Sequence, residues 1–524
     1  MILLDWLIIA ATIVLVLCVG FRLSRRQRDE VDYFLGGRRL RGWPVGLSLL
    51  ANQVSAISLV GAPAFIAVKA GGGLRWLQYE LAVPLAMAAI IVFLLPLYRG
   101  SRSISIYHYL EERFGPGLRL LVTMVFLLSR SLGSGVVLLA TAYVTAVCLD
   151  ISLLGALAAI ALVTLVYTTL GGITADIYTD ILQLAILWAS ALVCIILLVG
   201  MLGGVPGPLA ASESGRYAVI VTAGGAGSTF SFWPMLLGGF FLYLSYYGCD
   251  QSQAQRLLTT ADQGQARQAL LINGLLRFPI VATYCFIGYL LIPFLAAHPD
   301  FAARIGELPP DYIMPHFFRR YVPAGFLGFV IAGIFAAALS SLDSALNSLS
   351  AVSWNDVLLK LRPGLNGLRQ NRKLLVSRLL TVFWGTTAFL AALAMADSGE
   401  TVIEIVNKIG SAFYGPIAAV FVVGALAPRV RERAAICGLL AGFGVNICLW
   451  AFLSATLSWM WWNVAGFGSA AAVALAITIG GAAGPGRDAA PLSWSTKDRR
   501  AVWLMAAWFA VILLLLLALN QVLS

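Results

Sequence analysis

The chain has 524 residues, of which 60% are hydrophobic and only 11% are charged. Soluble domains carry about 25% charged residues, so this composition excludes a soluble globular protein and places most of the chain in a lipid bilayer. The formal net charge of +11 does not indicate nucleic-acid binding, because the basic residues are spread over short segments between apolar ones.

Fourteen apolar segments are predicted to cross the membrane, since a spanning helix needs about 20 apolar residues. The first lies where a signal peptide would, but its positive charges follow the apolar run, so we expect it to be retained. The predicted spans are 2–21, 43–68, 76–97, 116–146, 151–170, 177–202, 231–250, 269–296, 321–352, 379–396, 402–427, 434–456, 459–480 and 501–522.

Basic residues are distributed unequally between alternate loops. The loops on one side hold 25 of the 35 lysines and arginines, those on the other side hold six, and four lie within spans. Because basic loops stay in the cytoplasm, both termini are predicted to be extracytoplasmic. Short outer loops without glycosylation signals favour a bacterial inner (plasma) membrane.

No loop is long enough for a soluble catalytic domain, the longest being 203–230 and 353–378. The histidines, His108, His298 and His316, lack HExxH spacing or cysteine partners, and the seven cysteines form no CxxC motif. This pattern argues against metal-dependent and Ser/His hydrolysis. We therefore expect no enzyme activity and a function carried out within the membrane.

Polar residues interrupt the second predicted span. Asn52, Ser55, Ser58 and Pro63 stand where an apolar helix is expected, which is typical of a broken helix. Residues 243–251 offer a counterpart in the seventh span. Paired interruptions five spans apart predict an inverted repeat of five plus five helices, in which unwound carbonyls coordinate a cation near the midplane. A polar helix packed through small residues is the alternative.

A stripe of polar side chains ends the ninth predicted span. Hydroxyl, amide and carboxylate groups recur there at helical spacing and are hard oxygen ligands suited to a small cation. Serines in membrane helices often bond only to their own backbone, which is the plainer interpretation. The stripe consists of Ser340, Ser344, Asn347 and Ser348, flanked by Ser341 and Asp343.

Ionisable residues inside spans cost roughly 2.5–3.5 kcal/mol each on insertion scales, so each suggests a pathway or site. In the sixth span, Asp176 and Asp180 lie four residues apart on one face. Asp176 is close enough to the predicted boundary to be an ordinary interfacial residue. Asp180 is therefore the better candidate.

Five motifs together are similar to those of the sodium:solute symporters, a family of sodium-coupled sugar, sialic acid, proline and carboxylate transporters. They are DYFLGGR at 32–38, WPVGLS at 43–48, YTDILQ at 178–183, QR at 255–256 and SSLDSALNS at 340–348.

The resemblance implies an all-α integral membrane protein with a leucine-transporter-like 5+5 inverted repeat. One extra helix would precede the repeat and three would follow it. The implied divisions are a first helix and basic cytoplasmic loop (1–42), a first half (43–202), an extracellular loop (203–230), a second half (231–428) and three C-terminal helices (429–524).

The family's shared sodium site would fall on the carbonyls of Ala51, Val54 and Ala337 and the hydroxyls of Ser340 and Ser341. Sodium is thus the expected coupling ion.

A second ion site would map to Asp180, Ser340 and Ser344. Asp343 stands where the two-sodium sialic acid transporter has a hydroxyl residue. Its carboxylate would strengthen a second sodium site, pair with a base or carry a proton, which leaves the number of coupled ions open.

The substrate site implied by the resemblance is unusually cationic for a sugar site, because Arg130, Arg277 and Lys408 all belong to it. Arginine suits bidentate carboxylate recognition, which predicts an acidic sugar or small carboxylate. Internal pairing of these cations with Glu80, Glu404 or Asp250 is the alternative. The implied substrate residues are Ser55, Ser58, Glu80, Arg130, Tyr243, Tyr246, Arg277 and Lys408, with Tyr246 as an inner gate.

We therefore expect a sodium-coupled symporter whose partners are a small-molecule substrate and the lipid bilayer, without nucleic acid; its oligomeric state stays open. The alternatives are a ligand sensor of the same fold and a sodium symporter of a neutral sugar or amino acid. A channel is disfavoured, since no pore-lining ring of charges recurs.

Overall fold

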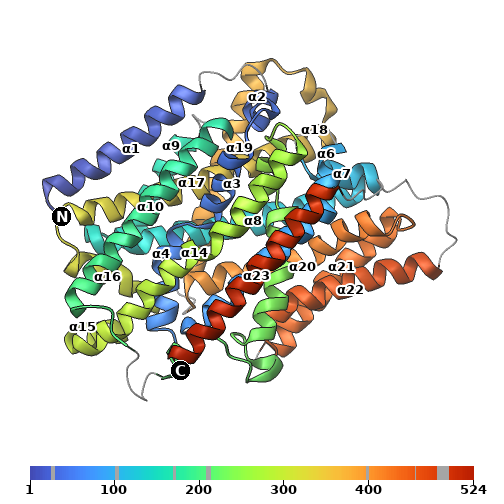
Figure 1. Ribbon diagram of the computed structural model, residues 1–524. Coiled ribbons are helices and arrows are strands. Elements are labelled where there is room, and N and C mark those ends of the chain that lie inside the picture. Colours follow the sequence, from blue (N-terminus) through green and yellow to red (C-terminus); the bar gives the residue numbers. More distant parts are fainter. Residues whose placement is uncertain are drawn as a thin grey trace.

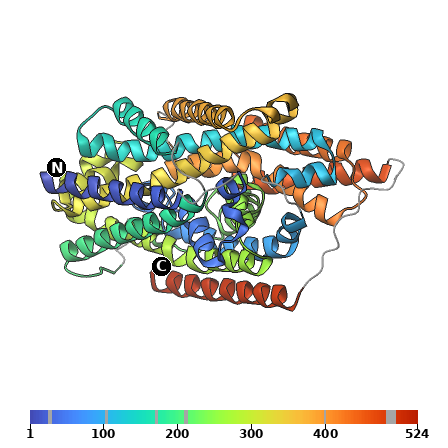
Figure 2. The same cartoon turned by 90° about the horizontal axis from the view of Figure 1, so that it is seen from above.

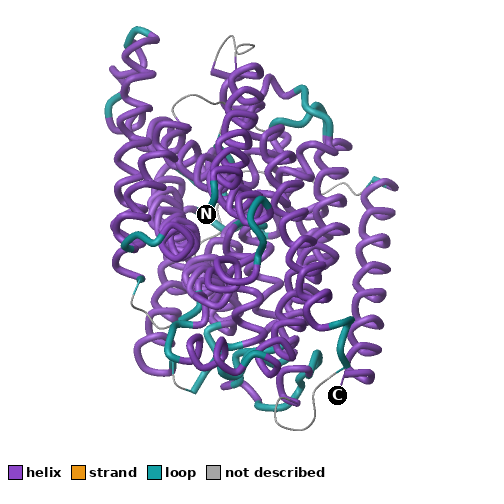
Figure 3. Tube along the Cα trace, turned by 90° about the vertical axis from the view of Figure 1, so that its left-hand side faces the viewer, coloured by secondary structure: helices purple, strands orange, loops and turns teal. Residues whose placement is uncertain are grey.

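The computed structural model describes residues 1–24, 30–100, 105–168, 173–207, 214–396, 400–454, 456–480 and 495–523. These residues form helices joined by short loops (Figure 3), and their one strand-like pairing is an isolated bridge between Leu40 and Thr260. The all-α architecture predicted from the sequence is confirmed.

Eleven of the described helices are long and apolar enough to cross a membrane, or twelve if a bent pair counts as one span. They correspond to twelve of the fourteen predicted spans. The principal elements are α1 (Leu3–Ser24), α3 (Gly42–Gln53), α4 (Ala56–Ala67), η2 (Leu74–Leu81), α5 (Ala82–Ala89), η3 (Ile90–Leu94), α6 (Leu95–Gly100), α8 (Pro116–Leu149), α10 (Ile173–Leu202), α14 (Gln263–Ala297), α17 (Phe326–Val352), α19 (Gln370–Met395), α20 (Val402–Leu426), α21 (Glu432–Leu453), α22 (Met460–Gly480) and α23 (Thr496–Leu523).

The two remaining predicted spans, 151–170 and 231–250, coincide with shorter helical segments. The first is α9 (Leu153–Thr168), and the predicted end of that span lies outside the described residues. The second is η5 (Pro234–Gly238) continued by α12 (Gly239–Cys249). Short helices fill the loops: α2 (Glu30–Leu35), η1 (Gly36–Arg38), α7 (Tyr107–Arg113), α11 (Ser214–Tyr217), η4 (Gly225–Gly227), α13 (Gln251–Leu258), α15 (Pro299–Gly306), η6 (Pro310–Tyr312), α16 (Ile313–Tyr321), η7 (Ser353–Leu358), α18 (Leu359–Leu361) and η8 (Pro363–Gly367).

The predicted break in the second span is confirmed. Helices α3 and α4 meet at an angle of 52°. Val54 and Ser55 adopt extended backbone angles between them, and the Ser55 hydroxyl accepts a hydrogen bond from Ile57 N (3.3 Å). A serine in this position caps the new helix and satisfies one of its unpaired N–H groups. Pro63 lies inside α4 without ending it.

A second break occurs at Asp250, at the end of the interruption that the sequence predicts at 243–251. Helix α12 runs unbroken to Cys249, and Asp250 is extended. The Asp250 carboxylate accepts hydrogen bonds from Ser252 N (2.8 Å) and Ser252 Oγ (2.5 Å), which starts α13. The tyrosines of 243–247 therefore stand on regular helix.

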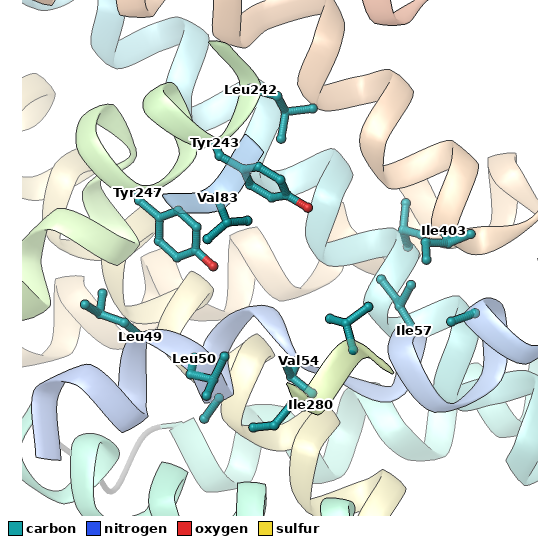
Figure 4. Packing of buried hydrophobic residues seen from close by; sticks show 14 of the residues in the cluster. Leu49, Leu50, Val54, Ile57, Val83, Leu242, Tyr243, Tyr247, Ile280 and Ile403 are labelled. Carbon is teal, nitrogen blue, oxygen red and sulfur yellow. The ribbon is translucent and has the colours of Figure 1, made fainter. Parts of the chain in front are cut away.

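Helix α3 lies unusually close to α14 because two glycines face it. A Cβ atom at Gly42 would lie 2.3 Å from the Gln265 carbonyl oxygen, and one at Gly46 would lie 2.8 Å from the Ala269 carbonyl oxygen. Small residues four apart allow two membrane helices to approach this closely. Beyond them, Leu50 and Val54 lead into the break (Figure 4).

The two ends of the bundle differ. Helices α15 and α16 mark one end, which we call the α16 end, and α7 and α18 mark the other, the α7 end (Figure 1). Asp5 near the N-terminus accepts hydrogen bonds from Gly325 N (2.7 Å) and Gly328 N (2.9 Å), just after α16. Both chain ends lie toward the α16 end, and α23 runs along the outside of the bundle (Figure 2).

A small polar junction joins α4, η6 and α20 at the α16 end. Lys69 Nζ lies 3.2 Å from Glu404 Oε2, and Glu404 forms a capping box with Thr401. Asp311 Oδ2 accepts a hydrogen bond from Val402 N at 2.8 Å. Burial raises the pKa of Asp311 to about 7, against the lowering effect of the Val402 N–H.

The raised pKa of Asp311 predicts a pH-dependent stability. A carboxyl with an unfolded pKa near 3.9 keeps its proton in the folded state up to about pH 7, so stability falls as pH rises from about 4 to about 7 and is level above. Asp311→Asn retains the acceptor for Val402 N–H but does not titrate. Its apparent unfolding midpoint in detergent should decline less between pH 5 and 7 than that of the unaltered protein.

Asp300→Asn, an exposed carboxylate on α15, is the matched control and should keep the original slope. Equal slopes for the protein and for Asp311→Asn would contradict the assignment.

Candidate functional site

A cavity lies at the break between α3 and α4, bounded also by α8, α12, α14, α17 and α20; its empty space, open solvent included, is about 1040 Å³. Six of the eight predicted substrate residues line it: Ser55, Ser58, Arg130, Tyr243, Tyr246 and Arg277. Figure 4 shows Tyr243 projecting from α12 on the same side as Tyr247. Glu80 and Lys408 are not among its lining residues.

Several polar atoms in the cavity wall lack a protein partner within the described residues. Buried polar atoms are normally hydrogen-bonded, so these indicate a place for water or a polar ligand. They are both side-chain atoms of the Asn52 amide, Gln53 Oε1, Arg130 Nε, Arg277 Nη1 and the Tyr284 hydroxyl.

Tyr284 was not predicted as a site residue from the sequence. It follows Arg277 by seven residues, two helical turns, so a periodicity argument on α14 would have placed both on one face. Ser129 and Ser134, on either side of Arg130 in the sequence, also line the cavity. The Ser129 hydroxyl donates to the Phe126 carbonyl, and the Ser134 hydroxyl donates to the Arg130 carbonyl.

Arg277 is paired with Glu80 just behind the cavity wall. Arg277 Nε lies 3.0 Å from Glu80 Oε2, and Nη2 lies 3.4 Å from Oε1. The Tyr243 hydroxyl donates to Glu80 Oε1 at 3.3 Å. Both charged side chains are buried. The pair is therefore neutral overall and leaves Arg277 Nη1 as a donor at the cavity.

Lys408 is also paired. Its Nζ lies 2.8 Å from Glu400 Oε1, and both side chains are about one-third exposed. Arg130 differs from the other two predicted cations, because no described carboxylate lies within 4.0 Å of its guanidinium. The buried Asp250 carboxylate attracts it from beyond 4.0 Å. Arg130 is thus the one of these three cations that has no direct ion pair within the described chain.

The residues expected to bind sodium gather where α17 passes the break. The Ser341 hydroxyl donates to the Asn52 carbonyl (3.3 Å), and the Ser340 hydroxyl donates to Asp180 Oδ1. The last carbonyls of α3 have no helical partner, because the helix ends there. Ala51 and Val54 lie at this end of α3, whereas Ala337 lies inside α17, one turn before Ser340 and Ser341.

A buried ionic cluster lies beside these serines, centred on Arg256 of α13. Arg256 Nη2 contacts Asp176 Oδ2 at 2.9 Å and Asp180 Oδ2 at 3.1 Å. Ser48 donates to Asp180, and Ser344 donates to Asp176 Oδ2 at 2.9 Å. The structure thus gathers Asp180, Ser344 and Ser340. Asp176, interpreted from the sequence as interfacial, is buried and paired.

Asp343 lies one residue before Ser344 on α17. Its Oδ1 accepts a hydrogen bond from Asn347 Nδ2 (3.0 Å), one turn along the same helix. That partner is a neutral amide, and no ion pair links Asp343 to a described lysine or arginine within 4.0 Å.

No group of three or more His, Cys, Asp or Glu in the described residues is arranged to hold a metal ion.

Comparison with known proteins gives a consistent result. The family model of the sodium:solute symporter family matches residues 33–442. The human sodium/iodide cotransporter is 28% identical over 82% of this chain and 66% of its own length. Human sodium-coupled monocarboxylate transporter 1 is 28% identical over 86% of this chain and 74% of its own.

For one bacterial relative and one solved structure, the match covers a larger share of the matched protein. The sodium/sialic acid symporter NanT of Aliivibrio fischeri is 27% identical over 88% of this chain and 90% of its own. A substrate-bound, outward-open Na+-coupled sialic acid symporter superposes with a TM-score of 0.77 at 24% identity, covering 93% of this chain and 99% of that one. The latter likeness establishes a shared fold.

The Arg277–Glu80 pair yields a stability prediction. Glu80→Gln leaves a buried guanidinium without its counter-charge, which should cost about 3 kcal/mol of stability. Adding Arg277→Gln removes the stranded charge and should recover much of the loss. Glu400→Gln, at the partly exposed Lys408 pair, is the control and should cost less than about 1 kcal/mol.

Apparent unfolding midpoints of the detergent-purified variants measure these effects. Similar losses for Glu80→Gln and Glu400→Gln, or no recovery in the double variant, would contradict the buried-pair interpretation.

Proposed function

The chain belongs to the sodium:solute symporter family, whose members are membrane transporters rather than enzymes, and we propose that it couples sodium entry to the import of a small organic monoanion. The observation that carries this proposal is Arg130, the cavity's cation without a carboxylate partner in the described chain.

The charge balance of the cavity favours an anion with one negative charge. Glu80 neutralises Arg277, and Lys408 pairs with Glu400 away from the cavity, so Arg130 is the cavity cation without a direct ion pair in the described chain. An arginine offers two parallel N–H donors to a carboxylate. The relatives named above are themselves named for anions: iodide, monocarboxylates and sialic acid.

The polar atoms without partners refine the proposal. A carboxylate on Arg130 would leave the amides of Asn52 and Gln53 and the free donor of Arg277 for further oxygen atoms of the substrate. A hydroxylated acid, such as an acidic sugar, uses more of these groups than a short monocarboxylate does. We therefore favour an acidic sugar over a small carboxylate.

Sodium coupling follows from the position of the proposed ion site. Ala51, Val54, Ala337, Ser340 and Ser341 belong to the break and to α17, so an ion held by all five ties these elements together. A bound sodium would stabilise the arrangement that shapes the cavity and would lose its ligands once α17 and α3 separate. Substrate affinity and sodium binding are thereby linked.

The orientation in the membrane completes the proposal. The basic loops favour an orientation with the α7 end in the cytoplasm and both termini outside, in a plasma membrane. The α16 end, with Lys69, Glu404 and Asp311, would then face the substrate's source. The halves 43–202 and 231–428 remain the predicted units of the inverted repeat.

Replacing both hydroxyls of the sodium site tests the coupling. Ser340→Ala with Ser341→Ala removes two of five ligands and should weaken sodium affinity by at least about tenfold, since bonds to a charged group contribute about 1.5–3 kcal/mol each. The sodium affinity is obtained from substrate uptake into proteoliposomes, measured as a function of sodium concentration. Ser350→Ala removes a hydroxyl of the same helix that bonds to the Ser377 carbonyl (2.8 Å) and should behave like the unaltered protein. An unchanged sodium dependence in the double variant would rule out the site.

Arg130 is tested by a ligand panel. Stabilisation by sialic acid, glucuronate, lactate, galactose and proline is measured with sodium and with potassium. We expect one anion to stabilise the protein only when sodium is present. The Arg130→Gln substitution should lower the affinity for that anion about 10- to 100-fold. Lys408→Gln should change the affinity little, because this lysine lies outside the cavity. A galactose or proline response without an anion response would overturn the anionic assignment.

A further inference from the structure

Asp250, at the break between α12 and α13, is a buried carboxylate with one oxygen atom that lacks a hydrogen-bond donor. Its Oδ1 accepts both hydrogen bonds from Ser252, whereas Oδ2 has no donor within the described residues. The residue is only 3% exposed. Buried polar atoms are normally hydrogen-bonded, and a buried acceptor without a donor is costly. Oδ2 therefore points to a partner that this arrangement of the chain does not bring to it.

A second acceptor without a donor belongs to Gln253, in the first turn of α13. Gln253 Nε2 donates to the Tyr246 hydroxyl (2.7 Å), but Gln253 Oε1 has no donor among the described residues. Tyr246 lines the cavity, whereas Asp250 and Gln253 are not among its lining residues. Two unsatisfied acceptors thus lie next to the Tyr246 end of the cavity, just outside it.

Arg130 is the cation that fits these acceptors. It lies in the cavity wall on α8, and its Nε is a buried donor without a partner in the described chain. Asp250 attracts its guanidinium from beyond 4.0 Å. Arg256 on α13 is already held by Asp176 and Asp180, so it is not available to Asp250. An arginine presents five N–H donors and can satisfy several acceptors at once.

The backbone around Asp250 is fixed, so a direct contact requires the guanidinium to move. The Tyr107 hydroxyl donates to the Cys249 carbonyl (3.3 Å), and Ile106 N donates to Gln251 Oε1 (2.9 Å). These bonds tie both neighbours of Asp250 to the start of α7. They also place the carboxylate toward the α7 end of the bundle. An arginine side chain has several rotatable bonds, which allow its head group to change position while the helix stays in place.

We propose that Asp250 takes the place of the substrate carboxylate on Arg130 once the substrate has left toward the α7 end. The inference rests on the proposed function, in which Arg130 holds the substrate. The arrangement described above, with Arg130 in the cavity wall, is the one that receives the anion.

This exchange of partners solves a problem of the return step. A symporter reorients empty after each turnover, and a buried guanidinium that has lost its anion is costly in a membrane interior. The Asp250 carboxylate supplies the missing counter-charge. Asp250 is thereby a positioning residue that acts through Arg130, and it does not contact the substrate.

Net uptake and exchange separate the return step from substrate binding. Sodium-driven net uptake of sialic acid or lactate into proteoliposomes requires the empty return, whereas exchange of internal for external labelled anion does not. Asp250→Asn keeps the cap of α13, because asparagine caps a helix as well as aspartate does. It should lower net uptake at least about tenfold and leave exchange within about twofold of the unaltered protein, since only the return step carries an unpaired buried charge.

Two further variants serve as controls. Asp250→Glu retains a carboxylate and should recover much of the net uptake. Asp262 caps α14 in the same way, accepting a hydrogen bond from Gln265 N (2.9 Å). Asp262→Asn makes the same chemical change away from the cavity and should leave net uptake and exchange unchanged.

The outcomes separate this inference from the proposed function. Equal losses of net uptake and exchange in Asp250→Asn would overturn the inference, because Asp250 would then serve binding or folding. Unchanged net uptake would overturn it as well. Both results leave sodium-coupled anion import intact. If the unaltered protein takes up no anion of the panel with sodium, the proposed function falls, and the inference with it.

Should Asp250→Asn fail to fold, cryo-EM maps of the unaltered full-length protein in nanodiscs decide. In potassium and without an anion, we expect the Arg130 guanidinium within 4.0 Å of the Asp250 carboxylate. With sodium and saturating sialic acid or lactate, it should contact the bound anion instead. A guanidinium that stays away from Asp250 in the anion-free protein would overturn the inference.

Discussion

A bilayer offers neither hydrogen-bond partners nor counter-charges, so each polar group buried there has to be satisfied by the chain or by what the chain carries. The described residues meet this constraint in two ways. Arg277 is neutralised by Glu80, and Arg256 by Asp176 and Asp180. Arg130 and the amide of Asn52 are left open, and both face the same cavity. The difference between satisfied and unsatisfied groups is what separates scaffold from binding site.

Helix α17 connects the proposed sodium site with the ionic cluster around Arg256. Ser341 reaches the end of α3, Ser340 reaches Asp180 on α10, and Ser344 reaches Asp176 together with Arg256. These serines lie within five consecutive residues, so one turn of helix contacts the break and the ionic cluster at once. A displacement of α17 from α3 therefore disturbs both positions in a single step, which links occupancy of the ion site to the shape of the cavity.

Much of this arrangement could be predicted from the sequence, because hydropathy reports the spans and polar interruptions report the break. The family motifs also pointed to Ser55, Arg130 and Tyr243, which line the cavity. The ion pairs of Arg256 could not be predicted, since they depend on aspartates 76 and 80 residues away that meet it only in the folded bundle. Asp176 was misjudged for the same reason: its distance from a predicted boundary says nothing about a guanidinium arriving from α13. Likewise, hydropathy could not tell that Arg277 forms an ion pair with Glu80 whereas Arg130 forms none within the described chain.

The glycine contact between α3 and α14 has a mechanical consequence. At Gly42 and Gly46 the two backbones are too close to slide past each other independently. We therefore expect α3 and the 35-residue α14 to move as one rigid unit. Farther along α14, Arg277 lies at the cavity. The Tyr289 hydroxyl of the same helix donates a hydrogen bond to the Pro206 carbonyl (2.6 Å). A tilt of this unit at the start of α3 therefore also displaces the opposite end of α14, on the other side of the membrane. Helix α4 also packs against α14, since a Cβ at Gly288 would lie 2.7 Å from the Ile66 Cβ. The bend at Val54 and Ser55 therefore joins two segments that both rest on α14.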